Sequence, residues 1–312
     1  MRELTEAKKM KRVEIAGLGF CGLDYLSILP HIPVDEKVEI VQSLVQGGGP
    51  AATAMVTAAR LGAQTAFIGA VGDDDRGLTI IQGLKHENVD TRYIQEKIGK
   101  ESPAAFCWIE KKSGKRSIAW SKGTSLPLDV NQVNPDFISS LKLLHLDGHN
   151  MEAAVKAARI AKDNGVIVSL DAGTMLPDID ILVGLADICI ASENFACHYT
   201  GENNIQKAAE KLFKTGCRIA AVTSGKNGVF AVTSNGSIKK DAFHVPVIDT
   251  TGAGDVFHGS FAYAYIQGLE YDYALDFASA AAALKCMNFG GRTGIPSSAE
   301  VHKFLQSKGV NK

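Results

Sequence analysis

The stretch that most constrains this chain lies at 247–268, where an extended apolar segment passes through a glycine turn into a helix. Apolar residues recur at helical spacing after the turn, and Gly268 offers a stop. The turn, Gly252-Ala253-Gly254, leaves backbone N–H groups without intrahelical partners and without large side chains in front of them. The positive end of the helix adds to this effect, so the sequence predicts a site for an anion such as a phosphate.

Asp255 falls in the first turn of that helix. A carboxylate there repels a bound phosphate, so this residue is a poor choice for binding alone. It is a sensible choice for a base that accepts the proton of a hydroxyl group attacking the phosphorus. For a lone Gly-x-Gly, the alternative is a surface helix that follows a glycine turn and carries no chemistry.

The seven residues Asp-Thr-Thr-Gly-Ala-Gly-Asp at 249–255 closely resemble the C-terminal signature of the ribokinase-like (PfkB-type) carbohydrate kinases. The resemblance implies that Gly252, Ala253 and Gly254 form the anion hole for the transferred phosphate. It also implies that Asp255 is the catalytic base and that the cofactors are ATP and Mg²⁺.

The resemblance extends to metal ions. In the family, Asp249 and Thr251, with the glycine-rich segment at 285–294, commonly hold a monovalent cation such as K⁺ near the anion hole. Many members also carry Asn-x-x-Glu, a motif tied to magnesium, where this chain has Ser192 and Glu193. Glu193 is therefore a candidate magnesium ligand, and a residue of a helix start is the alternative.

Composition limits the classes of partner. The chain has 312 residues, of which 46% are hydrophobic and 21% charged, as expected of a soluble globular protein. Its formal net charge of −1 argues against nucleic acid as a partner. The six cysteines are scattered without a C-x-x-C pair, which indicates reduced thiols in a cytoplasmic protein. No apolar run is long enough for a membrane span.

A strand expected at 13–16 is followed by a Gly-x-Gly-x-x-Gly match at 17–22. The NAD-type fingerprint needs a helix directly after these glycines, and Pro30 and Pro33 leave little room for one. We therefore do not expect a dinucleotide site. In the kinase family this first turn carries an aspartate that binds sugar hydroxyls, and the match is Asp24.

Residues 47–62 combine glycines with a helix of small side chains, and Pro50 suits the first helical position. The block resembles the N-terminal family signature that lines the sugar pocket. The resemblance implies sugar contacts at Gly48, Gly49 and Thr53, the last replacing the usual Asn.

The alternating pattern at 104–120 predicts a β-hairpin with a turn at 112–115, paired with a strand at 37–45. In the family such a sheet is the lid over the sugar and often the interface of a homodimer. We expect lid strands at about 20–45 and 102–122. Both tryptophans lie in the hairpin, which favours a covered face over a solvated edge.

The remaining pattern alternates strands and helices, which predicts an α/β fold: a mostly parallel sheet flanked by helices on both faces (ribokinase-like), with the β-sheet lid, as a single domain over 1–312. Further strands are expected at 143–146, 167–170, 188–191, 219–223 and 229–233. Helices are expected at 77–85 with an Asp74 or Asp75 cap, 152–164, 193–200, 205–215, 254–267, 273–286 and 297–306.

Ligands of such sheets bind beyond the carboxyl ends of the strands. Thr223, Ser224, Gly225 and Gly228 follow one strand and resemble the loop of the family that admits ATP phosphates and ribose. By the same resemblance, Ser192 and Asn288 are nucleotide-side residues.

Several motifs together look like the branch that contains sulfofructose kinases. Lys37 falls at a plausible sulfonate-binding position, but Trp120 and His149 stand where we would expect Asn and Arg. One lysine would under-compensate a desolvated anion, which favours an uncharged or differently substituted sugar, a ketose or pentose. The alternatives are a nucleoside kinase, with a base stacked on an aromatic residue of the lid, and a non-catalytic sugar-binding regulatory relative.

Overall fold

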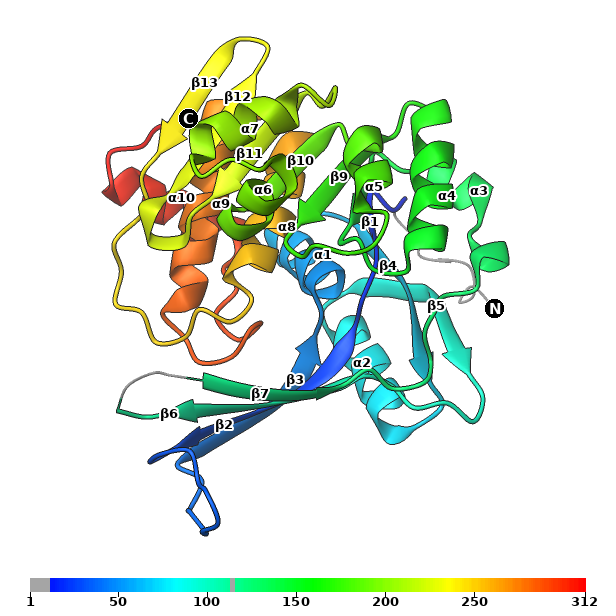
Figure 1. Ribbon diagram of the computed structural model, residues 1–312, viewed down its shortest axis with the longest axis vertical. Coiled ribbons are helices and arrows are strands. Elements are labelled where there is room, and N and C mark those ends of the chain that lie inside the picture. The colour runs from blue at the N-terminus through cyan, green and yellow to red at the C-terminus, as the bar shows by residue number, and fades with distance from the viewer. Residues whose placement is uncertain (1–11, 113–115) are drawn as a thin grey trace, which may run out of the picture.

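The computed structural model describes residues 12–112 and 116–312. Their strands form two sheets, and Figure 1 shows the smaller sheet as a separate blade below the larger one. This arrangement confirms the expected fold class. The predicted turn at 112–115 falls largely on residues outside the described part.

The larger sheet has nine strands within the described residues, in the order β13-β12-β11-β10-β9-β8-β1-β4-β5. All neighbouring strands from β11 to β5 are parallel, whereas the pairs β11–β12 and β12–β13 are antiparallel. The strands are β1 (Ile15–Leu18), β4 (Thr65–Gly72), β5 (Val89–Lys97), β8 (Leu143–Leu146), β9 (Ile167–Ala172), β10 (Ile188–Ser192), β11 (Ile219–Thr223), β12 (Val229–Thr233) and β13 (Gly236–Lys240).

Helices cover both faces of this sheet, because its central strands are apolar on both sides. One face packs against α1 (Pro50–Leu61), α2 (Asp75–His86), α8 (Ala253–Ile266), α9 (Tyr271–Cys286) and α10 (Ser298–Ser307). The other packs against α3 (Pro135–Ser139), α4 (Met151–Asp163), α5 (Ile179–Leu185), α6 (Glu193–Thr200) and α7 (Ile205–Phe213). Within the described ranges, none of the helices combines the length and the hydropathy that a membrane span needs.

Local signals set the helix ends. Asp74 caps α2 by accepting a hydrogen bond from Gly77 N–H, as one of the two expected alternatives. Pro50 opens α1, and Gly62 ends it in a left-handed conformation. Five elements, β4, β5, β13, α3 and α5, were not predicted from the sequence.

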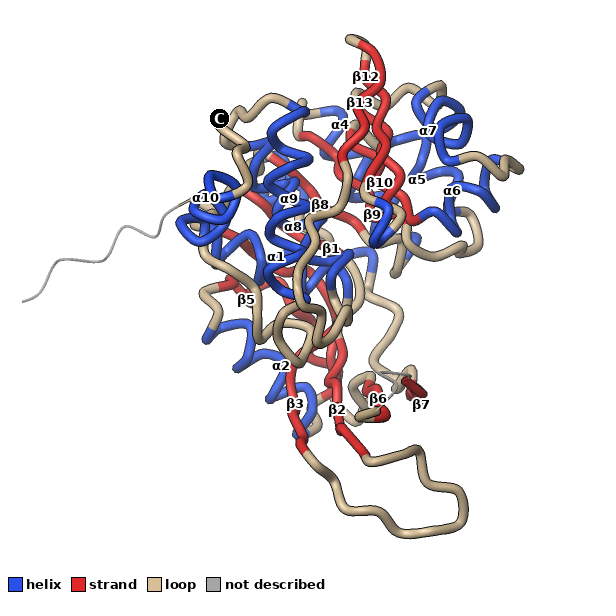
Figure 2. Tube along the Cα trace, turned by 90° about the vertical axis from the view of Figure 1, so that its left-hand side faces the viewer, coloured by secondary structure: helices blue, strands red, loops and turns tan. Residues whose placement is uncertain are grey.

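The smaller sheet, here called the lid, has the order β3-β2-β6-β7: β2 (Gly22–Leu29), β3 (Gln42–Gly48), β6 (Ala104–Glu110) and β7 (Arg116–Ser121). The β6–β7 hairpin is antiparallel, but it pairs with β2, in parallel, and not with the strand expected at 37–45. That strand begins only at Gln42 and pairs with the other edge of β2. Residues between β2 and β3 form the long loop at the lower tip of Figure 2. The strand β2 also rules out a helix after the glycines at 17–22, as predicted.

Residues directly opposite one another in paired strands share a face of the sheet. By register, the outer face of the lid carries Tyr25, Val45, Phe106 and Trp108, and the inner face carries Asp24, Leu26, Cys107 and Trp120. Leu26 and Cys107 pack against Phe289 of the loop that follows α9. The inner face is therefore directed toward the loops at the edge of the larger sheet.

Candidate active site

The start of α8 has the geometry predicted for an anion site. Gly252 precedes the helix at φ 74° with no side-chain cap. Ala253 N–H donates to Thr250 O at 3.2 Å, whereas the N–H groups of Gly254 and Asp255 have no backbone acceptor within the described residues. A Cβ built on Gly254 would meet no heavy atom within 4 Å. Two open amides thus face free space at the positive end of the helix.

The Asp255 side chain lies beside these amides, in a cavity of about 220 Å³ that Pro50, Asp147, His149, Asp171, Gly173, Thr174, Ser192, Thr223, Gly254 and His258 also line. Burial raises the pKa of Asp255 from 3.8 to about 7, and the negative charge of Asp171 adds to the rise. The positive charge of Arg292 opposes it. A carboxyl group that titrates near neutrality suits a base, because it can accept a proton and release it again.

Asp171 and His258 form a buried pair behind this carboxyl group. His258 Nε2 lies 3.1 Å from an oxygen of Asp171, and both side chains are at most one-tenth exposed. Burial alone would raise the pKa of Asp171, but His258 holds it below the ordinary value. Asp171 therefore stays ionised, and its charge acts on Asp255.

Asp147 explains one of the glycines at 17–22. Its carboxylate accepts hydrogen bonds from the N–H groups of Phe20, Ala51 and His149. A Cβ on Gly19 would lie 2.2 Å from the Asp147 carboxylate, so glycine is required there. Gly19 thus makes room for the Asp147 carboxylate, which fixes the loops around the cavity.

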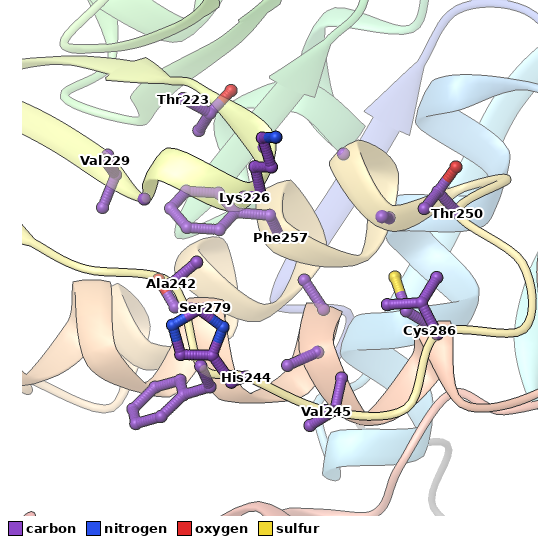
Figure 3. A pocket seen from close by; sticks show the side chains of 18 of the residues that line it. Thr223, Lys226, Val229, Ala242, His244, Val245, Thr250, Phe257, Ser279 and Cys286 are labelled. Carbon is purple, nitrogen blue, oxygen red and sulfur yellow. The ribbon is translucent and has the colours of Figure 1, made fainter.

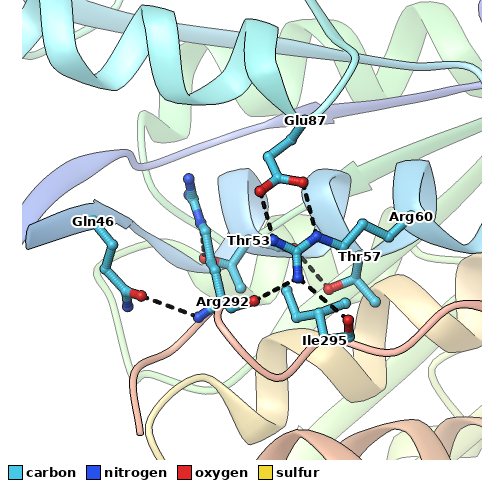
Figure 4. Close-up of polar contacts among 7 residues, drawn as sticks. All are labelled: Gln46, Thr53, Thr57, Arg60, Glu87, Arg292 and Ile295. Carbon is cyan, nitrogen blue, oxygen red and sulfur yellow. Dashed lines mark hydrogen bonds and ion pairs between the residues drawn. The ribbon is translucent and has the colours of Figure 1, made fainter. Parts of the chain in front are cut away.

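The sugar-side residues gather at Gly48. Figure 4 shows Arg292 of this group beside Thr53. A Cβ on Gly48 would lie 2.2 Å from an oxygen of Asp24, so this carboxylate rests directly on the glycine backbone. The Arg292 guanidinium group donates to Gly48 O and to Thr53 Oγ1, both at 3.1 Å. Burial raises the pKa of Asp24 to about 6, although the Arg292 charge lowers it. Burial also lowers the pKa of Arg292 to about 10.

The other residues predicted to bind sugar do not all lie at the cavity. His149 lines the same cavity as Asp255. Burial lowers the His149 pKa, but the interactions with Asp147 outweigh this effect and raise the pKa above its ordinary value. Thr53 is buried and holds Arg292. Gly49 precedes α1 at φ 97°, where a Cβ would lie 2.3 Å from Phe20 O. Trp120 is 66% exposed on the inner face of the lid. Lys37 is exposed on the loop between β2 and β3.

A second cavity, of about 320 Å³ and mostly apolar, adjoins the first (Figure 3). Its lining includes Thr223, Gly225 and Gly228 from the predicted nucleotide loop. A Cβ on Gly228 would lie 2.0 Å from Lys240 O, so this position requires glycine. The remaining lining, which the sequence analysis did not identify, comes mainly from 242–247 and from α8 and α9: His244, Val245, Val247, Phe257, Ser279, Ala282, Ala283 and Cys286.

Four predicted nucleotide or metal residues lie at the margins of these cavities. Ser192 lines the first cavity and caps α6, accepting from Phe195 N–H at 3.2 Å. Asn288 and Glu193 are both exposed, and Glu193 is the first residue of α6. Ser224 follows β11, and its buried hydroxyl group has no hydrogen-bond partner within the described residues.

Asp249 and Thr251 lie under the anion turn. The Asp249 carboxylate accepts from Thr251 N–H at 2.8 Å and from Gly290 N–H at 2.9 Å. Burial raises the Asp249 pKa, but these hydrogen bonds and the Lys285 charge bring it below the ordinary value. Lys285 Nζ donates to the backbone oxygen of Asp249 at 2.8 Å. Asp249, which was expected to hold K⁺, thus already binds the ammonium group of Lys285 through its backbone oxygen.

Sequence reasoning missed Arg292 and Lys285. Both are buried cations in the glycine-rich segment at 285–294, where Asn288 is the residue predicted individually. Charged side chains are almost never fully buried without partners. Two cations among glycines were therefore the available signal.

Open helix-start amides, a carboxyl group with a raised pKa and an adjoining apolar cavity define an enzyme site that handles an anionic group. The model of the pfkB family of carbohydrate kinases matches residues 25–298, and the chain belongs to this family. It is therefore a carbohydrate kinase, a phosphotransferase, as the motif at 249–255 predicted.

Named relatives agree with this assignment. The chain is 32% identical to a ribokinase of Haemophilus influenzae over 304 residues, 95% of this chain and 99% of the relative. It is 26% identical to a 5-dehydro-2-deoxygluconokinase of Geobacillus thermodenitrificans, over 96% of this chain and 94% of the relative. The structure of Arabidopsis thaliana ribokinase complexed with ribose and ATP has the same fold, with a TM-score of 0.83, 24% identity and coverage of 94% of this chain and 99% of that one. The finer resemblance to sulfofructose kinases stays a prediction.

Proposed function

We propose that this protein transfers the γ-phosphoryl group of ATP to a hydroxyl group of a small, uncharged sugar of the ketose or pentose type. One observation carries the proposal: Asp255, with a pKa of about 7, lines the polar cavity beside the open amides of Gly254 and Asp255, and the apolar cavity adjoins it at Gly254. The mostly apolar cavity accepts the nucleotide. The polar cavity, lined by Asp255 and His149, accepts the part of the sugar that carries the attacking hydroxyl group, and the rest of the sugar extends toward Gly48 and Asp24.

The chemistry follows from the charges. Phosphoryl transfer depends mostly on positioning and on neutralising the charge that develops on the transferred group. The amides at the start of α8 stabilise that charge, and Asp255 accepts the proton of the attacking hydroxyl group. Burial, together with the charge of Asp171, keeps the Asp255 pKa high enough for the carboxylate to bind that proton at neutral pH.

Mg²⁺ would neutralise part of the nucleotide charge when it is bound with ATP. The described residues contain no group of three or more His, Cys, Asp or Glu side chains that could hold a metal ion. This suits Mg²⁺, which is usually held by one or two carboxylates together with phosphates and water. Glu193, exposed at the start of α6, remains the proposed carboxylate.

The charge around Gly48 supports an uncharged sugar. The Asp24 carboxylate opposes the Arg292 guanidinium group, so the two formal charges balance. An anionic substituent buried here would face Asp24 and would lack a free counter-charge. A carboxylate oxygen above a glycine backbone is instead well placed to accept hydrogen bonds from sugar hydroxyl groups.

A panel of acceptors tests this proposal. Purified protein with Mg-ATP should release ADP with ribose or a ketose, and the phosphosugar should be detected by mass spectrometry. The panel also includes 5-dehydro-2-deoxygluconate, a sulfosugar and nucleosides. Trp120, on the inner face of the lid, is the aromatic residue that a nucleoside would stack on. ADP release with nucleosides alone would establish the nucleoside kinase, and no turnover with any acceptor would leave a sugar-binding relative.

The outer face of the lid supports a homodimer. Val45 is 52% exposed, and Phe106 and Trp108 are each 38% exposed. Such an apolar surface suits contact with a second copy, whose lid presents the same self-complementary face. Light scattering should show a dimer, and Trp108→Glu should shift it toward monomer. A monomeric wild-type protein would contradict this assembly.

A further inference from the structure

We infer that Lys285 permanently replaces the exchangeable monovalent cation that the family resemblance implies at Asp249 and Thr251. This rests on the proposed function, because the cation would serve the anion turn at 252–254. The Lys285 side chain is fully buried, 0% exposed, in the last turn of α9. Its ammonium group donates to the backbone oxygen of Asp249, only three residues before Gly252.

The ammonium group belongs to a framework that holds the anion turn. Its partner Asp249 binds Thr251 N–H and Gly290 N–H through the carboxylate, which joins the two loops. The N–H groups of Ile248 and Asp249 also donate to Cys286 O, the residue after Lys285. The C-terminal end of α9 therefore fixes the segment that leads into the turn.

The loops on either side of the turn also touch directly. A Cβ on Gly252 would lie 2.8 Å from Gly291 O, so the turn rests on the glycine-rich segment. A cation held between these loops is close to the open amides of Gly254 and Asp255. It can favour negative charge there without contacting the phosphate.

A free K⁺ ion does not fit beside this ammonium group. An ion held at Asp249 would lie next to the Lys285 ammonium group, which already donates to the Asp249 backbone oxygen. Two unit charges about 4 Å apart, in surroundings of intermediate dielectric constant, would weaken binding of the ion by roughly 10³-fold. The chain therefore carries its own cation, and its activity should not depend on added K⁺.

The test compares wild type with Lys285→Ala, which leaves space for an ion, and with the matched control Lys285→Met, which fills the space without charge. Turnover and melting temperature are measured in choline chloride and in KCl, NH₄Cl or methylammonium chloride at equal ionic strength. Wild type should change by less than about twofold between salts. Lys285→Ala should lose roughly 10- to 100-fold in kcat, less than removal of a direct oxyanion donor.

Small cations should restore Lys285→Ala by at least about fivefold and raise its melting temperature, whereas choline should do neither. Lys285→Met should be slow in every salt. Stimulation of wild type by K⁺ would overturn the inference. So would a folded Lys285→Ala protein that no small cation rescues, and if that variant does not fold, the wild-type response decides.

The melting temperatures and the affinity for a fluorescent ATP analogue need no sugar. They test Lys285 even if no acceptor is phosphorylated, so failure of this inference and failure of the proposed kinase reaction are distinguishable. A wild-type affinity for the analogue that rises with K⁺ but not with choline would again contradict the built-in cation.

Discussion

The most informative perturbation is Asp255→Asn, because it should lower the activity and raise the stability of the folded protein. The amide keeps the shape of the side chain but accepts no proton, so turnover should fall at least ~100-fold, the lower end of general-base contributions. Asn also removes a charge that the fold accommodates at a cost. The same substitution should therefore stabilise the protein.

The size of that gain follows from the pKa. Burial and Asp171 raise the folded-state pKa to about 7, whereas the unfolded chain titrates near 3.8. The folded state therefore prefers the protonated form, and ionisation destabilises it progressively between those values and fully above pH 7. The difference corresponds to roughly 4 kcal/mol at most. Since the Asp255 side chain stays partly exposed, we expect about 2 kcal/mol.

Thermal unfolding followed by circular dichroism at pH 5 and pH 8 measures this gain. Asp255→Asn should melt about 3–6 °C above wild type at pH 8 and by clearly less at pH 5. The matched control is Asp35→Asn, in the exposed loop between β2 and β3, which should leave both curves unchanged. Turnover close to wild type would remove Asp255 from catalysis, and an equal melting difference at both pH values would refute the electrostatic reasoning.

Three further predictions follow from the same geometry. Because the carboxylate of Asp255 is the active form, kcat/KM should rise about tenfold per pH unit up to about pH 7 and then level off; a flat profile from pH 5 to 8 would contradict this. Asp24→Asn should raise the KM for sugar at least ~10-fold while calorimetry finds unchanged ATP affinity, and equal loss of both would count against a sugar contact. Gly252→Ala should cost about 1–3 kcal/mol in urea unfolding, since its φ is 74° and its Cβ would approach Gly291 O, whereas the control Gly83→Ala, in open space on α2, should not destabilise.

The fold was predictable where burial and pattern agree. The strands at 143–146, 219–223 and 229–233 were placed to the residue, because each is a short apolar run with clear breaks on both sides. The edge strand β13 is short and largely exposed, so it carries no such signal. The partner of the β6–β7 hairpin was wrong, because alternation reports which side chains share a face and not which strand lies alongside.

The site was predictable where its parts are consecutive. Gly252 to Asp255 form one local turn, and propensity, capping and charge act together within it. Arg292 and Lys285 reach the site from the far end of the chain, and only tertiary packing buries them. The Asp171–His258 pair likewise joins a strand end to a helix, so neither residue alone indicated the charge that acts on Asp255.

Gly254, Thr223 and His258 line both cavities and form the partition between them. Two ligands seated on either side would meet at Gly254, which has no side chain, so the phosphoryl group could pass directly from one to the other. Double-reciprocal initial-rate plots should therefore intersect rather than run parallel. With a chiral thiophosphate donor, the configuration at the transferred phosphorus should be inverted in the product. No product could leave before both reactants had bound.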